Sequence, residues 1–167
     1  MILFLDFDGV LHPDSVYMGS SGPLLRAPGA LFMWASILES QLLQFADINI
    51  VLSTSWVRQL DFSRAKKKLP AALRERVVGS TWHSSMAKGW ADQNWWDQAS
   101  RYQQIMRYVN RTNTTQWLAV DDDGEGWNAA HRDKLVLTNP STGISPQQVQ
   151  AELTNKLKNL VPCDSQR

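Results

Sequence analysis

Four aspartates in two close pairs are the residues best suited to chemistry in this 167-residue chain. Asp6 and Asp8 flank a phenylalanine near the beginning, and Asp121 and Asp122 follow far downstream. Each pair comes after a short apolar run, so each is expected at the end of a buried strand. Mg²⁺ prefers oxygen ligands and is typically held by one or two carboxylates together with a substrate phosphate. The two pairs therefore predict magnesium-dependent phosphate chemistry if the fold brings them together.

The elements that must position these acids are two strands of one sheet. The runs 2–5 and 117–120 are typical of buried strands, and ligands of open α/β folds bind at the edge where such strands end. Side chains two residues apart on a strand point to opposite faces, so Asp6 and Asp8 share a site only if the chain turns there. Gly9 permits that turn.

Strands and helices are predicted to alternate along the rest of the chain. Ser100 and Gln103 form a capping-box pattern that begins a helix at Arg101. The other expected elements are a helix over 30–45, a strand over 48–52, a helical stretch over 61–76 interrupted at Pro70, a weaker strand at 77–78, a strand over 135–137 and a final helix opening at 145–148. This alternation predicts a three-layer, Rossmann-like α/β fold with a mostly parallel sheet and helices on both faces.

Two segments do not fit the alternation. Residues 12–28 are rich in Gly, Ser and Pro, too broken for a helix, and are expected to form a flap beside the site. Residues 80–99 carry four tryptophans and few aliphatic residues, which favours an irregular loop or short helices. The tryptophans either form a small core of their own or offer a stacking surface to substrate. Both segments are short, so a single domain over 1–167 with a minimal cap is predicted.

The bulk composition excludes several classes of protein. The formal net charge is +1, so no basic surface for duplex nucleic acid or an anionic membrane is indicated. No apolar run reaches the length of a transmembrane helix. The single cysteine, Cys163, excludes an intrachain disulfide framework and a cysteine metal cluster. This cysteine usage fits a reducing compartment, so a cytoplasmic protein is expected, and the sequence does not indicate its oligomeric state.

The segment Asp6–Leu11, with the sequence DFDGVL, resembles the first motif of the haloacid dehalogenase (HAD) superfamily of phosphohydrolases. Thr54, after the strand over 48–52, resembles the second motif, and Arg101 takes the place of the basic third motif. The Asp121-Asp122 pair resembles the acidic fourth motif. These motifs occur in the family's order over most of the chain. The resemblance implies a small, capless HAD phosphatase that uses Mg²⁺.

Chemistry gives each acid an expected role. Asp6 is the candidate nucleophile, which would form an aspartyl-phosphate and split one displacement into two easier ones. Asp8 would protonate the leaving alkoxide and then deprotonate the attacking water. Asp6 and Asp121 fit as direct Mg²⁺ ligands, and Asp122 fits as a ligand through water or as an orienting acid. The resemblance implies that the backbone carbonyl of Asp8 also binds the metal, and that the dehalogenase and transport-ATPase branches lack an acid at this position.

Two further side chains are expected to hold the phosphate. The Thr54 hydroxyl can donate to a phosphoryl oxygen, and Arg101 offers a rigid fork of donors at the beginning of a helix. Ser53 is the alternative to Thr54 if the strand ends one residue earlier. Lys88 is the alternative to Arg101 if the tryptophan-bearing segment folds inward. His12 lies close to the first motif, but a histidine there more often caps a turn, so it is placed outside the catalytic set.

The predicted activity is magnesium-dependent hydrolysis of a phosphomonoester. A non-catalytic phosphoryl- or metal-binding module on the same scaffold is one alternative, and a phosphotransferase is another. With so little cap the site is expected to be open, so a small molecule, a nucleotide, a polynucleotide end or a phosphoprotein all remain possible substrates.

Overall fold

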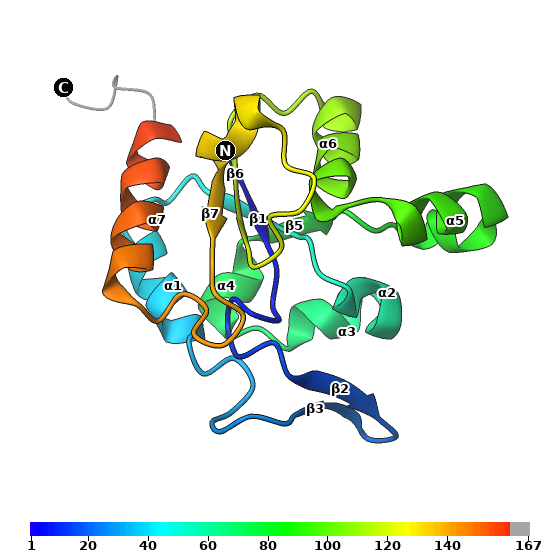
Figure 1. The fold of residues 1–167 in the computed structure, drawn as a ribbon, viewed down its shortest axis with the longest axis horizontal. Helices are drawn as coiled ribbons and strands as arrows, with labels where there is room; N and C mark the ends of the chain where they lie inside the picture. Colours follow the sequence, from blue (N-terminus) through cyan, green and yellow to red (C-terminus); the bar gives the residue numbers. More distant parts are fainter. Residues whose placement is uncertain (161–167) are drawn as a thin grey trace.

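The computed structural model describes residues 1–160, and its centre is a five-stranded sheet (Figure 1). In spatial order, its strands are β5 (Val77–Ser80), β4 (Asn49–Leu52), β1 (Ile2–Leu5), β6 (Trp117–Asp121) and β7 (Leu135–Leu137). Every neighbouring pair in this sheet runs parallel. The predicted α/β fold with a mostly parallel sheet is therefore confirmed.

The register of the central strand decides which residues meet at the carboxyl edge. Leu5 of β1 pairs with Leu52 of β4 on one side and with Val120 of β6 on the other. Positions 6, 53 and 121 therefore lie next to one another where the three strands end. This is the geometry that the two aspartate pairs required.

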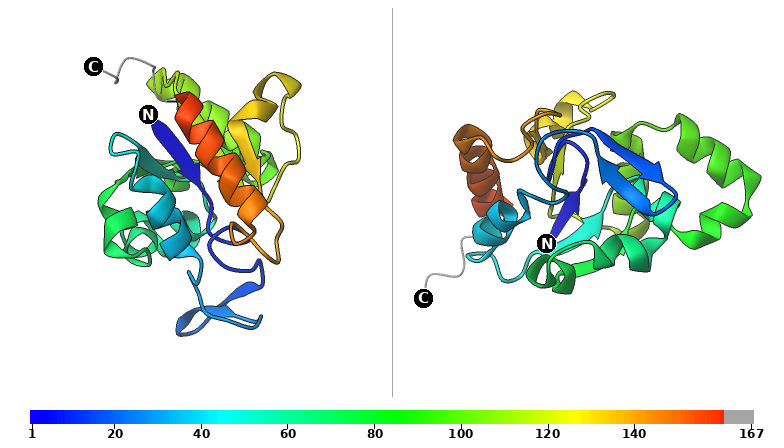
Figure 2. Two further views of the ribbon diagram at one scale, coloured as in Figure 1. Left: turned by 90° about the vertical axis from the view of Figure 1, so that its left-hand side faces the viewer. Right: turned by 90° about the horizontal axis from the view of Figure 1, so that it is seen from below.

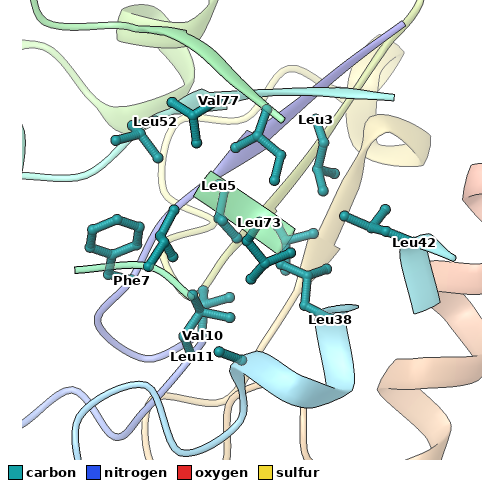
Figure 3. Close-up of a cluster of buried hydrophobic side chains, with 14 of the residues drawn as sticks. Leu3, Leu5, Phe7, Val10, Leu11, Leu38, Leu42, Leu52, Leu73 and Val77 are labelled. Atoms are coloured by element: carbon teal, nitrogen blue, oxygen red, sulfur yellow. The ribbon is translucent and has the colours of Figure 1, made fainter. Parts of the chain in front are cut away.

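Helices cover both faces of the sheet because side chains alternate along each strand. Leu3 and Leu5 face the larger core, which is shared with α1 (Ala35–Leu42) and α7 (Gln147–Leu160) (Figure 3). Phe4 faces a second core, which is shared with α6 (Arg101–Thr112). Figure 2 shows α1 and α7 together on one side of the sheet. The three predicted layers are thus present.

The segment predicted as a flap contains a small antiparallel hairpin, which was not predicted. Its strands are β2 (Val16–Gly19) and β3 (Gly22–Leu25), and it extends beyond the carboxyl edge of the sheet (Figure 1). The interspersed Gly, Ser and Pro residues concealed the pairing in the sequence. A short strand whose partner lies only a few residues away gives little periodic signal of its own.

The tryptophan-bearing segment forms short helices, one of the two predicted outcomes. It contains the 3₁₀ helix η1 (Ser84–Lys88) and the helix α5 (Trp90–Gln98), which projects from the body (Figures 1 and 2). The rings of Trp82 and Trp96 are buried and lie 5.1 Å apart. Trp90 is 80% exposed. Packing therefore accounts for Trp82 and Trp96 but not for Trp90.

The predicted helix over 30–45 was too long, since α1 covers only Ala35–Leu42. Phe32 has a φ of 60°, which is incompatible with a right-handed helix. Its N–H group donates to His12 Nδ1 at 3.2 Å instead of entering a helical ladder. The apolar stripe before residue 35 thus belongs to a loop that packs against the core.

The stretch over 61–76 divides as predicted, with Pro70 between α3 (Phe62–Lys67) and α4 (Ala71–Glu75). Two short helices, α2 (Trp56–Leu60) and η2 (Ala129–Lys134), were not predicted. Within residues 1–160, no helix is long and apolar enough to cross a membrane. Cys163 lies outside the described residues.

Candidate active site

The turn after β1 brings its two acids to one edge of the sheet. The Leu11 N–H donates to the Phe7 carbonyl oxygen at 2.9 Å, and Gly9 has a φ of +67°. A Cβ atom built on Gly9 would lie only 2.2 Å from Asp122 Oδ2. Gly9 is therefore required twice, for the left-handed backbone and for the close approach of the Asp122 side chain.

Three carboxylates meet at this edge. One ligand oxygen from each of Asp6, Asp121 and Asp122 lies within 4.8 Å of the other two. The Phe7 N–H donates to Asp6 Oδ1 at 2.8 Å, and the Asp123 N–H donates to Asp121 Oδ1 at 3.0 Å. Backbone donors thus fix one oxygen of both buried acids, and Asp122 is half-buried beside them. We call these three carboxylates the acidic cluster.

Arg101 lies directly against the acidic cluster. Its Nη2 is 3.3 Å from Asp6 Oδ2, and its Nε is 3.0 Å from Asp121 Oδ2. The second contact is close but poorly directed, because Nε and Asp121 Oδ2 are both buried without a hydrogen-bond partner among residues 1–160. The position of Arg101 comes from the Ser100–Gln103 capping box, which is fully formed and begins α6 at this residue. The helix start predicted from that pattern is confirmed.

Burial, and then the neighbouring charges, shift the pKa values of the whole cluster. Burial raises the pKa of Asp6, and the charge of Arg101 only partly opposes that rise. Burial, together with the charge of Asp6, raises the pKa of Asp121 well above its usual range. Burial and the same charge raise the pKa of Asp122 to about 7. Burial alone would lower the pKa of Arg101, but the neighbouring carboxylates outweigh it and raise the pKa.

A divalent cation fits this arrangement. Three carboxylates face one guanidinium, and a buried oxygen of Asp121 has no hydrogen-bond donor among the described residues. Mg²⁺ takes oxygen ligands of this kind, and a second positive centre would stabilise the charged carboxylates, whose pKa values burial and mutual repulsion raise. Asp6, Asp121 and Asp122 are therefore the residues that could hold it.

Asp8 lies outside the acidic cluster and is held by different groups. Its Oδ1 lies 3.0 Å from His12 Nε2, and its Oδ2 accepts a hydrogen bond from Trp56 Nε1 at 2.8 Å. The side chain of Asp8 is 21% exposed, whereas that of His12 is fully buried. The turn after β1 thus supplies one acid to the cluster and a second, separately held acid beside it.

Residues 2–149 match the family model described as the HAD domain in Swiss Army Knife RNA repair proteins. The chain belongs to this HAD family. The match covers most of the chain, in agreement with the resemblance found in its motifs, and it supports a HAD-type phosphoryl-transfer function. Proteins of this family are associated with RNA repair and with phosphorylated substrates. No curated protein and no solved structure matches the chain.

The structure places the alternative candidates for holding phosphate in different surroundings. Thr54 is buried near Asp6, and its hydroxyl acts to lower the Asp6 pKa, against the larger effect of burial. The Ser53 hydroxyl is also buried and has no hydrogen-bond partner among the described residues. Lys88 is exposed at the end of η1 and makes no ion pair within residues 1–160. Arg101 is therefore the basic side chain at the cluster. The Thr54 hydroxyl accepts from the Trp56 N–H at 3.4 Å, whereas the Ser53 hydroxyl is unpaired among the described residues.

A pocket opens beside Asp8 and is bounded by the flap. It has a volume of about 460 Å³ and is lined by Asp8, Val16 and Met18 of β2, Ser55, Trp56 and Gln59. The hairpin thus forms one wall of this pocket, and Val16 and Met18 limit the space beside Asp8. A groove of about 530 Å³ follows the outer edge of β5, but none of the candidate site residues lines it.

Sequence reasoning missed the two partners of the Asp8 carboxylate. His12 was considered and placed outside the catalytic set, and Trp56 was assigned no role. A signal existed for each, since His12 follows Asp8 by four residues across a glycine turn and Trp56 follows Thr54 by two. Only the folded chain shows that both nitrogens converge on the same carboxylate.

Proposed function

We propose that this HAD domain is a magnesium-dependent phosphatase that removes a terminal phosphate from RNA through an aspartyl-phosphate intermediate. The observation that supports it most is the acidic cluster of Asp6, Asp121 and Asp122 with Arg101 against it. A phosphomonoester repels an anionic nucleophile, so a carboxylate can attack only where positive charge is concentrated on the phosphoryl oxygens. This edge of the sheet holds the candidate nucleophile, the Arg101 guanidinium and the carboxylates that would bind Mg²⁺.

The first step is a displacement at phosphorus. An Asp6 oxygen forms a bond to phosphorus while the bond from phosphorus to the leaving oxygen breaks. Asp8 gives its proton to that leaving oxygen, so that an alcohol departs instead of an alkoxide. Arg101 and the Thr54 hydroxyl hold phosphoryl oxygens. When bound, Mg²⁺ would supply Lewis-acid neutralisation of the phosphate charge.

The second step hydrolyses the intermediate. Asp8, now a carboxylate, removes a proton from a water molecule whose oxygen attacks phosphorus. The bond between phosphorus and the Asp6 oxygen breaks, inorganic phosphate leaves, and both aspartates return to their starting forms. Asp8 therefore ends the cycle protonated, ready for the next leaving group.

The position of Asp8 favours a catalyst over a binding module. Binding of phosphate or metal needs no acid or base, yet Asp8 is fixed at the margin of a pocket next to the cluster. RNA is favoured as substrate because the family is that of RNA repair proteins. A phosphotransferase would use the same first step and differ only in the acceptor of the phosphoryl group.

The decisive experiment measures phosphate release from a panel of phosphomonoesters. The panel holds single-stranded RNA oligonucleotides with a 3′- or a 5′-phosphate, the matching mononucleotides, a phosphoserine peptide and an aryl phosphate. We expect turnover of an RNA end with Mg²⁺, none with a chelator, and none with Asp6→Asn. Asp47→Asn is the matched control, because Asp47 is an exposed acid in the loop before β4.

Three other outcomes would redirect the proposal. Absence of metal-dependent turnover across the whole panel would favour the binding module. Faster turnover of the phosphopeptide or of the mononucleotides than of the RNA would reject RNA as the substrate class. Formation of a phosphorylated alcohol at the expense of inorganic phosphate, when glycerol is added, would indicate a phosphotransferase.

A further inference from the structure

The Asp8 carboxylate is fixed by two nitrogen donors that come from separate parts of the chain. His12 Nε2 lies 3.0 Å from Oδ1, and Trp56 Nε1 lies 2.8 Å from Oδ2. His12 belongs to the loop after β1, whereas Trp56 begins α2 after β4. Each oxygen of the carboxylate therefore has its own partner, so that neither rotation nor translation of the group is free.

The hydrogen bond on the far side of His12 decides which nitrogen carries the proton. The Phe32 N–H donates to His12 Nδ1 at 3.2 Å, so Nδ1 is the acceptor nitrogen. The ring then has its hydrogen on Nε2, the nitrogen that faces Asp8. The unusual left-handed backbone at Phe32, with a φ of 60°, aims that N–H at the ring. The loop conformation thus makes His12 a donor to Asp8.

Aromatic packing makes both donors rigid. The His12 ring lies 5.0 Å from the Phe32 ring and 5.7 Å from that of Trp56, measured between centroids. The Trp56 ring in turn contacts Phe7 at 5.5 Å and Phe32 at 5.4 Å. His12 is 0% exposed and Trp56 is 1% exposed. Side chains confined in this way hold their hydrogen-bond directions with little loss of entropy on binding substrate.

The open side of the Asp8 carboxylate faces the pocket. Asp8 and Trp56 both line the cavity of about 460 Å³ that Val16 and Met18 of the flap close on the other side. Each carboxylate oxygen has two lone pairs, and His12 and Trp56 occupy one on each oxygen. The remaining lone pairs are available for the proton that the leaving group takes.

We propose that His12 and Trp56 are positioning residues that aim Asp8 at the leaving-group oxygen, and that they act on the rate only through Asp8. The proposal rests on the phosphatase function proposed above. Its consequence is selective, because an ester with a poor leaving group needs a proton from Asp8 and an ester with a good one does not. Loss of either donor is therefore expected to slow the first kind of substrate and spare the second.

The test compares two esters in single-turnover experiments that measure only the first step. Release of the alcohol from an RNA 3′-phosphate requires a proton, whereas 2,4-dinitrophenolate leaves 2,4-dinitrophenyl phosphate as a stable anion. Trp56→Phe removes the donor and keeps the aromatic packing. His12→Phe removes the other donor, and His12→Gln offers an amide N–H near the position of Nε2. Trp117→Phe is the control, a buried tryptophan in the second core at the beginning of β6.

We expect Trp56→Phe and His12→Phe to slow release from the RNA phosphate by about 10²-fold, the usual effect of a misplaced catalytic group. Release of dinitrophenolate should fall less than about threefold, because no proton transfer is involved. His12→Gln should recover part of the lost rate. An equal fall with both esters, or no fall with either, would overturn the positioning role. Wild-type protein that is inactive on both esters would instead reject the phosphatase function itself.

A double-mutant cycle separates positioning from general damage to the fold. If Trp56 acts only through Asp8, Trp56→Phe should have no further effect on RNA phosphate release once Asp8→Asn is present. Additive losses would show that Trp56 supports the site in another way and would contradict the proposal. Thermal unfolding of each variant identifies any protein that is not folded. If His12→Phe is unfolded, Trp56→Phe and the cycle still decide the question.

Discussion

Asp6 and Asp8 are two residues apart and their carboxylates are stabilised in different ways. Asp6 belongs to a group of three carboxylates that shares one arginine and in which an oxygen of Asp121 has no donor among the described residues. Asp8 has an N–H group for each of its oxygens, from His12 and from Trp56. The acidic cluster is short of positive charge, whereas both oxygens of Asp8 already have a hydrogen-bond donor within the protein.

The difference follows from what each region has to do. Polar groups that must receive a ligand are left partly unsatisfied in the protein alone, because the ligand supplies the missing partners. A group that has to move a proton at one point in space needs fixed geometry before the ligand arrives. The acidic cluster therefore depends on what binds there, and the Asp8 environment depends on packing. Substitutions in the two regions should therefore have different consequences.

Removal of Arg101 should have the largest effect. Arg101→Gln keeps hydrogen-bonding capacity but leaves Asp6 and Asp121 without their cation, so RNA phosphate turnover should fall by about 10²- to 10³-fold. Loss of one partner from a buried charged group also costs about 3–5 kcal/mol of unfolding free energy. Steady-state kinetics and urea unfolding measure the two effects.

Arg107→Gln is the matched control for that substitution. Arg107 lies on the same helix and pairs with Asp92 at a more exposed position, where an ion pair contributes little. Turnover and stability should both stay near the wild-type values. Equal effects of the two substitutions would mean that the contact of Arg101 with the cluster has no special importance.

Removal of one cluster carboxylate should next weaken Mg²⁺ binding. Asp121→Asn takes away a buried ligand and should lower Mg²⁺ affinity by at least about 10-fold, with Asp122→Asn having a smaller effect because Asp122 is only half-buried. The dependence of the thermal midpoint on Mg²⁺ concentration reports the affinity without any assay of activity. Glu125→Gln, an exposed acid in the loop after β6, should bind Mg²⁺ like the wild type. Retention of full affinity by Asp121→Asn would place the metal elsewhere.

Much of the fold was predictable because local signals and tertiary structure agreed. The apolar runs of β1, β4 and β6 are buried on both faces, so their sequences are continuous hydrophobic stretches. The start of α6 followed from a capping box that depends on neighbouring residues alone. The hairpin over β2 and β3 did not follow, because it depends on a short-range pairing. The late start of α1 did not follow either, because it depends on the left-handed backbone at Phe32.

The acidic cluster was predictable for a related reason. Strands that end at the same level of a parallel sheet must bring their next residues together, so Asp6 and Asp121 could be placed in one site from the sequence. The partners of Asp8 could not be placed in this way. The approach of Trp56 to Asp8 depends on the path of α2 and on aromatic packing across three segments. No spacing rule encodes such a contact.

Gly9 lies between the two regions, and Gly9→Ala should disturb them by a moderate amount. A Cβ atom at Gly9 would collide with the Asp122 carboxylate at 2.2 Å, so Asp122 must rotate away from the cluster. Mg²⁺ affinity should fall to about that of Asp122→Asn, and the left-handed backbone costs roughly 1 kcal/mol in addition. Gly22→Ala is the control, since Gly22 has a φ of +109° with open space around its Cβ position. A loss of affinity in both variants would point to backbone strain and not to Asp122.

The smallest predicted effect is the pH dependence of stability without metal. The folded-state pKa of Asp122 is about 7, above its ordinary value of 3.8, because of burial and the charge of Asp6. Between these values the folded chain binds a proton that the unfolded chain has already lost, so the unfolding free energy must decrease as pH rises. The contribution is fully present below pH 3.8 and is lost as pH passes through about 7.

Thermal midpoints at pH 5 and pH 8 in a chelator test this directly. Asp122→Asn should show a shallower decrease over this interval than Asp47→Asn, which removes an exposed acid far from the cluster. Saturating Mg²⁺ should reduce the difference between the two variants at pH 8, because the bound cation takes the place of the proton in neutralising the cluster. Equal slopes in the two variants would show that Asp122 has an ordinary pKa. The contrast between a charge-deficient cluster and a completed Asp8 environment would then apply only to the buried pair of Asp6 and Asp121.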